Sequence, residues 1–209
     1  MNAPERLTEY AVEFASLLKT LNSTEADPAL YDDVKQIYID NVRAADKYFT
    51  GEETAQLIKM INAVPDGSGM IHGDYHTNNI MVQSNGDLVL IDMAGISRGD
   101  SLFDIGGTFL TMYLSGINNP SITKNVIGID YELAKQVWGI TLSTYYGTTD
   151  RQRLELLGQR CGAFALLRMA TTLGMGTERA VKQSASITAM LRERLFPNTD
   201  CKSKEYRLQ

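Results

Sequence analysis

Residues 71–95 contain the stretch that decides the fold, IHGDYHTNNIMVQSNGDLVLIDMAG. It combines short apolar runs, which are typical of strands, with Asn85-Gly86, a strong signal for a tight hairpin turn. We therefore expect a small β-rich segment in which two strands fold back on one another. The expected strands are 70–72, 79–83 and 88–91.

The rest of the chain has apolar residues at three- and four-residue steps, which is the period of amphipathic helices. Pro28 suits the first position of the second helix, and Asn118-Asn119-Pro120 ends the fourth. Residues 95–100 read as a loop. The fold class is therefore mainly α with a small β-hairpin segment, an α+β chain. The expected helices are 3–22, 28–48, 51–64, 101–116, 130–146, 150–173 and 177–195.

Length and composition indicate one globular unit at 1–196 followed by a polar tail at 197–209. The net charge of −5 is unlike that of a nucleic-acid-binding protein. No apolar run reaches the roughly 18 residues of a membrane span, so we expect neither nucleic-acid nor membrane partners. Cys161 and Cys201 are too few for a disulfide framework, and we expect two free thiols in the cytoplasm.

Three polar residues of this segment are spaced as a catalytic group and a metal site require. Asp74 and Asn79 bracket a short loop, and Asp92 ends the next strand, so a hairpin can bring Asn79 and Asp92 together at one end. Carboxylate and carboxamide oxygens are the hard ligands that Mg²⁺ prefers when it also binds phosphates. Asp74 would then be free to accept a proton from an attacking hydroxyl.

The same spacing is that of phosphoryl transfer in kinases, where an Asn follows the catalytic Asp by five residues and a metal-binding Asp lies beyond. Residues 72–79 also resemble the His-Gly-Asp-x-His-x-x-Asn pattern of the aminoglycoside phosphotransferase and choline kinase-like family. Ile91-Asp92 corresponds to the family's Ile-Asp, and residues 99–105 to its Gly-Asp-Pro-x-x-Asp-Ile stretch. Met93 and Ser101 depart from the family's aromatic residue and proline, but neither position needs to supply a catalytic group.

This resemblance implies an ATP-dependent phosphotransferase that acts on a hydroxyl of a small molecule. Asp74 would be the catalytic base, and Asn79 and Asp92 would hold Mg²⁺ on the ATP phosphates. Met81 and Ile91 would form the floor under the adenine ring, with simple core packing as the alternative.

The resemblance also implies residues that brace the catalytic loop through hydrogen bonds, His72, His76 and Asp104. For Asp104 the alternative is the N-cap of the helix that it introduces.

Two features favour a small-molecule acceptor over a protein. Gly73 stands where protein kinases have an arginine. Only 12 positions separate Asp92 from Asp104, which leaves no room for the long activation loop of a protein kinase. The helical part at 101–195 then reads as the substrate-binding region.

The family's smaller N-terminal lobe, with its nucleotide-covering loop and strand lysine, has no counterpart here. The residues before His72 read as helices, and their lysines fall on helical faces. We therefore expect an isolated C-terminal lobe of a kinase-like fold, with low activity and weak Mg·nucleotide binding on its own. The uncovered apolar face of the lobe would favour self-association.

Two other interpretations remain at this point. A metallohydrolase would use the cluster of His72, Asp74 and His76, but zinc hydrolases usually need three protein ligands, often with further histidines, and the chain has no third histidine. A non-catalytic or vestigial kinase-like module would keep the fold for binding or assembly.

Overall fold

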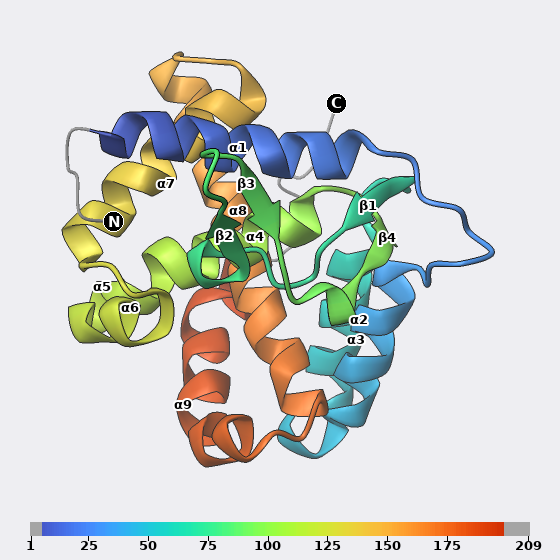
Figure 1. The fold of residues 1–209 in the computed structure, drawn as a ribbon. Coiled ribbons are helices and arrows are strands. Elements are labelled where there is room, and N and C mark those ends of the chain that lie inside the picture. Colours follow the sequence, from blue (N-terminus) through green and yellow to red (C-terminus); the bar gives the residue numbers. More distant parts are fainter. Residues whose placement is uncertain (1–5, 199–209) are drawn as a thin grey trace.

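The computed structural model describes residues 6–198, which form a mainly helical body around two small antiparallel sheets of two strands each (Figure 1). This confirms the expected fold class. The helices are α1 (Leu7–Ser23), α2 (Val34–Ala44), α3 (Gly51–Asn62), α4 (Leu102–Phe109), α5 (Ser115–Asn118), α6 (Pro120–Ile127), α7 (Tyr131–Tyr146), α8 (Arg151–Gly174) and α9 (Glu178–Arg194). The strands are β1 (Gly69–Ile71), β2 (Ile80–Val82), β3 (Leu88–Leu90) and β4 (Ser97–Gly99).

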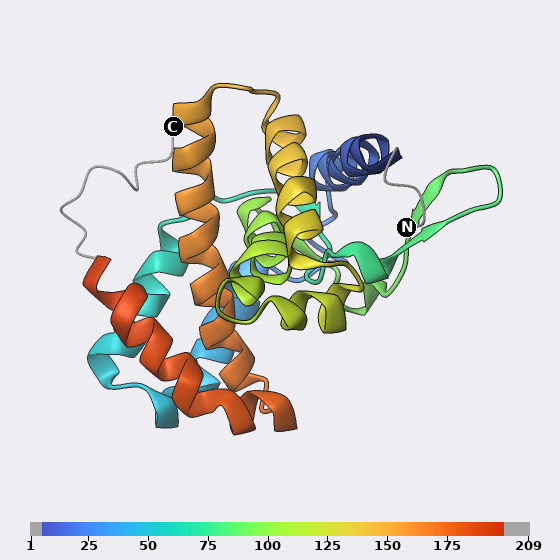
Figure 2. The ribbon, with the colours of Figure 1, turned by 90° about the vertical axis from the view of Figure 1, so that its left-hand side faces the viewer.

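The expected hairpin is present as β2 and β3, with Met81 opposite Val89. Gly86 in the connecting turn has a φ of 94°, a conformation that glycine adopts without a steric penalty. Figure 2 shows that the hairpin projects from the helical body, with α1 nearby. One face of the hairpin is consequently free of the helical core.

The loop expected at 95–100 is wrong, because Ser97–Gly99 forms β4 and pairs with β1. The pairing brings Gly69 opposite Gly99 and Ile71 opposite Ser97. A side chain at Gly67 would lie 2.4 Å from the Gly99 carbonyl oxygen, so a glycine is required for this close approach. Strand β4 has only three residues, too few to show the alternating pattern of a strand. It can be recognised only from its pairing with β1, which is distant in sequence.

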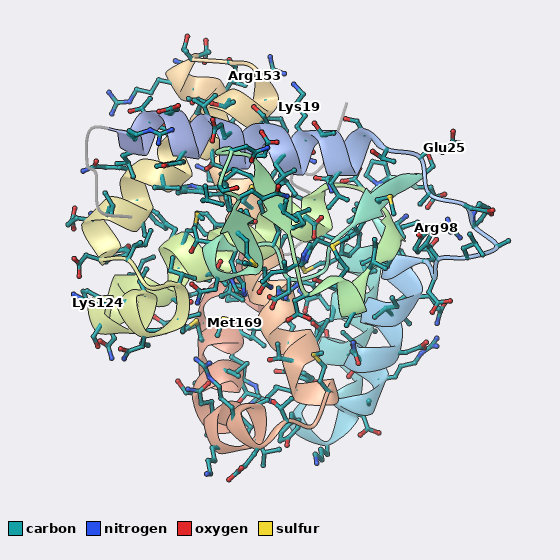
Figure 3. The ribbon with its side chains drawn as sticks, viewed as in Figure 1. Lys19, Glu25, Arg98, Lys124, Arg153 and Met169 are labelled. Carbon is teal, nitrogen blue, oxygen red and sulfur yellow. The ribbon has the colours of Figure 1, made fainter. Side chains whose placement is uncertain are left out.

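The second helix begins six residues later than Pro28, at Val34, so its expected start is wrong. Asp33 caps the helix by accepting a hydrogen bond from Lys35 N. The residues just before Asp33 run alongside β4 and do not form a turn of helix. There the Arg98 N–H donates to the Asp32 carbonyl oxygen at 2.9 Å, and Figure 3 shows Arg98 beside this segment. A tertiary contact therefore overrides the helical period.

The helical region expected at 101–116 ends at Asn118, as Asn118-Asn119-Pro120 predicts, but Pro120 also opens a helix that was not expected, α6. Proline suits the first turn of a helix because its missing N–H would have no partner there, and Asn119 caps the next turn through Ser121 N. The last two long helices, α8 and α9, lie within a residue of their expected bounds. Most of the expected tail at 197–209 lies outside the described residues.

The long helix α8 runs through the middle of the molecule, where it packs against α2, α4 and α9 (Figure 1). Its inward residues Cys161, Ala165, Leu167 and Ala170 are fully buried. None of the helices described between residues 6 and 198 is long and apolar enough to cross a membrane. The packing of α8 on α4 fixes the helix that supports the loop between β1 and β2.

We predict that Gly106→Ala destabilises the protein. A Cβ at Gly106 on α4 would lie 2.6 Å from the Cβ of Phe164 on α8, so the two helices would have to separate. Overpacking of this kind costs about 1–3 kcal/mol. Gly139→Ala on α7 is the matched control, because a Cβ there meets no atom within 4 Å, and it should stabilise by up to about 1 kcal/mol. Urea unfolding measures both, and equal midpoints for the two variants would contradict the prediction.

Candidate functional site

The 72–79 loop joins β1 to β2 and places Asp74 at its exposed edge. Both carboxylate oxygens of Asp74 have partners. Oδ1 accepts a hydrogen bond from Arg168 Nη2 at 3.0 Å, and Oδ2 lies 3.3 Å from His76 Nε2. The hydrogen bond from His76, together with the charge of Arg168, lowers the pKa of Asp74 below its ordinary value. Asp74 is therefore held in its ionised form.

Asn79 ends the same loop and is buried. Its Nδ2 donates to the Asp74 carbonyl oxygen at 2.9 Å, which leaves the amide oxygen as the atom that can face a ligand. The backbone oxygen of Asn79 accepts from Ile91 N at 2.9 Å, across the hairpin. This bond places Asn79 beside the residue that precedes Asp92, so both candidate metal ligands lie at one end of the hairpin.

Asp92 has a left-handed backbone, with φ of 59° and ψ of 54°, and is the one non-glycine residue with positive φ in the described range 6–198. Most side chains pay about 1–2 kcal/mol for this conformation, although Asp and Asn tolerate it better. The residue is exposed. Strained backbone of this kind is frequent at ligand-binding sites.

The pair of Asn79 and Asp92 suits Mg²⁺, which binds through one or two protein oxygens, phosphate oxygens and water. Within residues 6–198 no group of three or more His, Cys, Asp or Glu side chains is placed to hold a metal ion. The alternative of a metallohydrolase therefore has no ligand cluster in this part of the chain.

His72 connects the loop to the hairpin. It is completely buried, its Nδ1 accepts from Asp74 N at 3.2 Å, and its Nε2 lies 3.1 Å from the Ile91 carbonyl oxygen. These partners are those of a neutral ring with its proton on Nε2. His72 thus contacts both Asp74, the candidate base, and Ile91, the residue before Asp92.

His76 acts on the same loop from the other side. Its Nδ1 accepts from Asn78 N at 3.3 Å, which leaves Nε2 to donate to Asp74. His76 therefore links the turn after Asp74 to the carboxylate itself.

Asp104 lies in the first turn of α4 and is buried beneath the loop. Its oxygens accept from Gly73 N at 2.8 Å and from His72 N at 2.9 Å. Burial raises the pKa of Asp104, and these donors oppose the shift. The alternative of an N-cap is wrong, because that position belongs to Ser101.

The sequence prediction missed three residues that contact this site, Asn22, Tyr145 and Arg168. Asn22 Nδ2 donates to Asp104 Oδ2 at 2.9 Å, and Tyr145 in turn donates to Asn22 Oδ1 at 3.1 Å. Asp104 lies 82 positions from Asn22, and no spacing rule pairs residues so far apart. The available signal was weak: a polar residue at the end of an apolar helical face.

The expected adenine floor is exposed, with 56% of Met81 and 36% of Ile91 accessible. The alternative of core packing is therefore wrong for both. Strand alternation places Val89 on the same face. The opposite face, with Ile80, Val82 and Leu88, lines a cavity of about 590 Å³ beside α1.

We predict that Asp92→Ala is less stable than Asp92→Asn by about 1 kcal/mol, since alanine tolerates the left-handed backbone less well than asparagine. Both substitutions remove the charge, so the difference isolates the backbone term. Urea unfolding of the two variants measures it. Equal unfolding free energies would show that residue 92 does not require this conformation.

Comparison with known proteins identifies the family and the fold. A model of the phosphotransferase enzyme family matches residues 2–124, more than half of the chain. A crystal structure of aminoglycoside phosphotransferase APH(2'')-Ib, ADP-bound, superposes with a TM-score of 0.52 at 15% identity. The match covers 89% of this chain and 64% of that one, while no curated protein matches. The expected family and kinase-like fold are confirmed: the chain belongs to the phosphotransferase enzyme family.

Proposed function

We propose that the chain carries the catalytic and acceptor-binding part of an ATP- and Mg²⁺-dependent phosphotransferase that acts on a hydroxyl of a small molecule. One observation carries the proposal: Asn79 bonds to the backbone of both Asp74 and Ile91, so the candidate base and both candidate metal ligands share one end of the hairpin. Membership of the phosphotransferase family supports the reaction class.

In this proposal the amide oxygen of Asn79 and the carboxylate of Asp92 hold Mg²⁺. The ion, when bound, would supply positive charge that offsets the charge of the ATP phosphates. The face with Met81, Val89 and Ile91 would hold the adenine ring. Apolar side chains in that position remove the ring from water, and the similar solved structure has ADP bound.

Asp74 orients the acceptor hydroxyl and takes its proton. The hydroxyl oxygen forms a bond to the γ-phosphorus, the bond from that phosphorus to the β,γ-bridging oxygen breaks, and ADP leaves. The lowered pKa of Asp74 keeps the carboxylate charged and makes it a weak base. A weak base suffices because the transition state of phosphoryl transfer is loose, and the proton moves late.

The chain spans 64% of the length of the similar aminoglycoside phosphotransferase. We propose that a further lobe covers the face that includes Met81 and Ile91, and that without it the chain binds Mg·nucleotide weakly and turns over slowly. The same apolar face favours self-association where no lobe covers it.

We predict that millimolar Mg·ADP raises the melting temperature of this chain slightly, because a ligand that binds the folded state alone stabilises it by about 0.4 kcal/mol at a concentration equal to its Kd. Asn79→Ala and Asp92→Ala should remove the Mg²⁺-dependent part of the shift. Asp74→Asn is the matched control and should keep it, since Asp74 is not a metal ligand in the proposal. Absence of any shift in the wild-type chain at millimolar Mg·ADP would favour a non-catalytic module.

The role of Asp74 calls for a second measurement, ADP release with aminoglycosides and choline as trial acceptors. Acceptor-dependent release by the wild-type chain should fall by about 10²–10⁴ in Asp74→Asn, which is the usual contribution of a general base. An Asp74→Asn variant with unchanged acceptor-dependent release would remove Asp74 from the role of base.

A further inference from the structure

Arg168 lies on α8, 94 positions after Asp74, and enters the site from the helical core. Figure 3 labels its neighbour Met169 near the centre of the molecule. The guanidinium makes two contacts with the 72–79 loop. Nη1 donates to the Gly73 carbonyl oxygen, and Nη2 donates to Asp74 Oδ1 at 3.0 Å.

The two acceptors belong to the adjacent residues Gly73 and Asp74. The first is a backbone carbonyl and the second is a side-chain carboxylate. A planar guanidinium that binds both fixes the carboxylate relative to its own backbone, which a single point charge cannot do. Oδ2 of the same carboxylate lies against His76 on the other side. The two partners together define one orientation of Asp74.

Arg168 is placed where its charge acts strongly on Asp74. Its side chain is 19% exposed, whereas that of Asp74 is 52% exposed. Burial lowers the pKa of Arg168, whereas Tyr38 on α2 and Asp74 raise it. The raising effects are larger together, so the pKa of Arg168 lies above its ordinary value. The side chain therefore remains a cation. The groups that face Asp74 are then His72 and His76 from the loop and Arg168 from α8.

The neighbouring helix α4 leaves room for this side chain. A Cβ at Gly107 would lie 3.3 Å from Arg168 Nη1, which is tight, and 3.5 Å from its Cδ, which is ordinary van der Waals contact. Glycine at this position therefore lets the guanidinium pass α4 without a close contact.

We infer that Arg168 is a positioning residue for phosphoryl transfer: it bridges the Gly73 carbonyl and the Asp74 carboxylate and holds the base in one orientation. The mechanistic meaning rests on the proposed function, because it takes Asp74 as the base. The bridge itself is a property of the folded chain and can be tested without substrate.

The test is the χ1 rotamer of Asp74, read by NMR from three-bond couplings to its Cβ protons in the full chain labelled with ¹³C,¹⁵N-aspartate. The signals are assigned by their loss in Asp74→Asn. The wild type should show a single rotamer, whereas Arg168→Gln should show averaged couplings, because the fork that binds both the Gly73 carbonyl and the carboxylate is removed. Arg168→Lys should show weaker averaging, since it keeps the charge and loses the two-pronged contact. Wild-type couplings in both variants would overturn the inference.

A glycine variant on the same helix is the control. A Cβ at Gly158 on α8 meets no atom within 4 Å, so the Asp74 couplings of Gly158→Ala should equal those of the wild type. If Arg168→Gln does not fold, Arg168→Lys decides the question, and wild-type couplings in that variant would overturn the inference.

Mg·ADP binding, measured in parallel, separates this inference from the proposed function. Averaged Asp74 couplings in Arg168→Gln, in a chain whose wild type binds no Mg·ADP, would keep the bridge and refute the metal and nucleotide site. Normal Mg·ADP binding with unchanged couplings in Arg168→Gln would keep the nucleotide site and refute the bridge.

Discussion

The 72–79 loop depends on one buried carboxylate. Asp104 accepts the backbone N–H groups of His72 and Gly73, and without it the buried N–H of His72 would have no partner, at a cost of about 1–3 kcal/mol. Because Asp104 belongs to α4, the position of the loop is set by the packing of α4 on the central helix α8.

The same constraint reaches the end of the hairpin that carries Asn79 and Asp92 through His72. The ring accepts the Asp74 N–H on one nitrogen and contacts the Ile91 carbonyl with the other, so the loop and the end of β3 cannot move independently. Gly73, with a φ of 83°, allows the sharp turn between His72 and Asp74. The candidate base in the loop and the candidate metal ligand after β3 are thereby kept at a fixed separation, as the proposed phosphoryl transfer requires.

Local signals in the sequence were sufficient for the parts that local physics determines. The Asn85-Gly86 turn and the long apolar stripes of α8 and α9 were predicted correctly. The spacing of Asp74, Asn79 and Asp92 suggested the site because all three lie within one supersecondary unit. Strand β4 and the start of α2 were missed because each depends on a partner distant in sequence: β1 for the strand, and Arg98 for the residues before Val34.

Arg168 was missed for the same reason, because its partner Asp74 is 94 positions away in sequence. Its position also affects the chemistry of the Asp74 carboxylate. An arginine beside a general base lowers the basicity of the carboxylate, which would be a disadvantage if the proton moved early in the reaction. In a loose transition state the nucleophile gains little charge before the phosphoryl group has left, so orientation of the hydroxyl matters more than basicity. A base held from two sides, by His76 and by Arg168, meets that requirement. Under the proposed function, helix α8 therefore contributes to the geometry of the reaction as well as to the core.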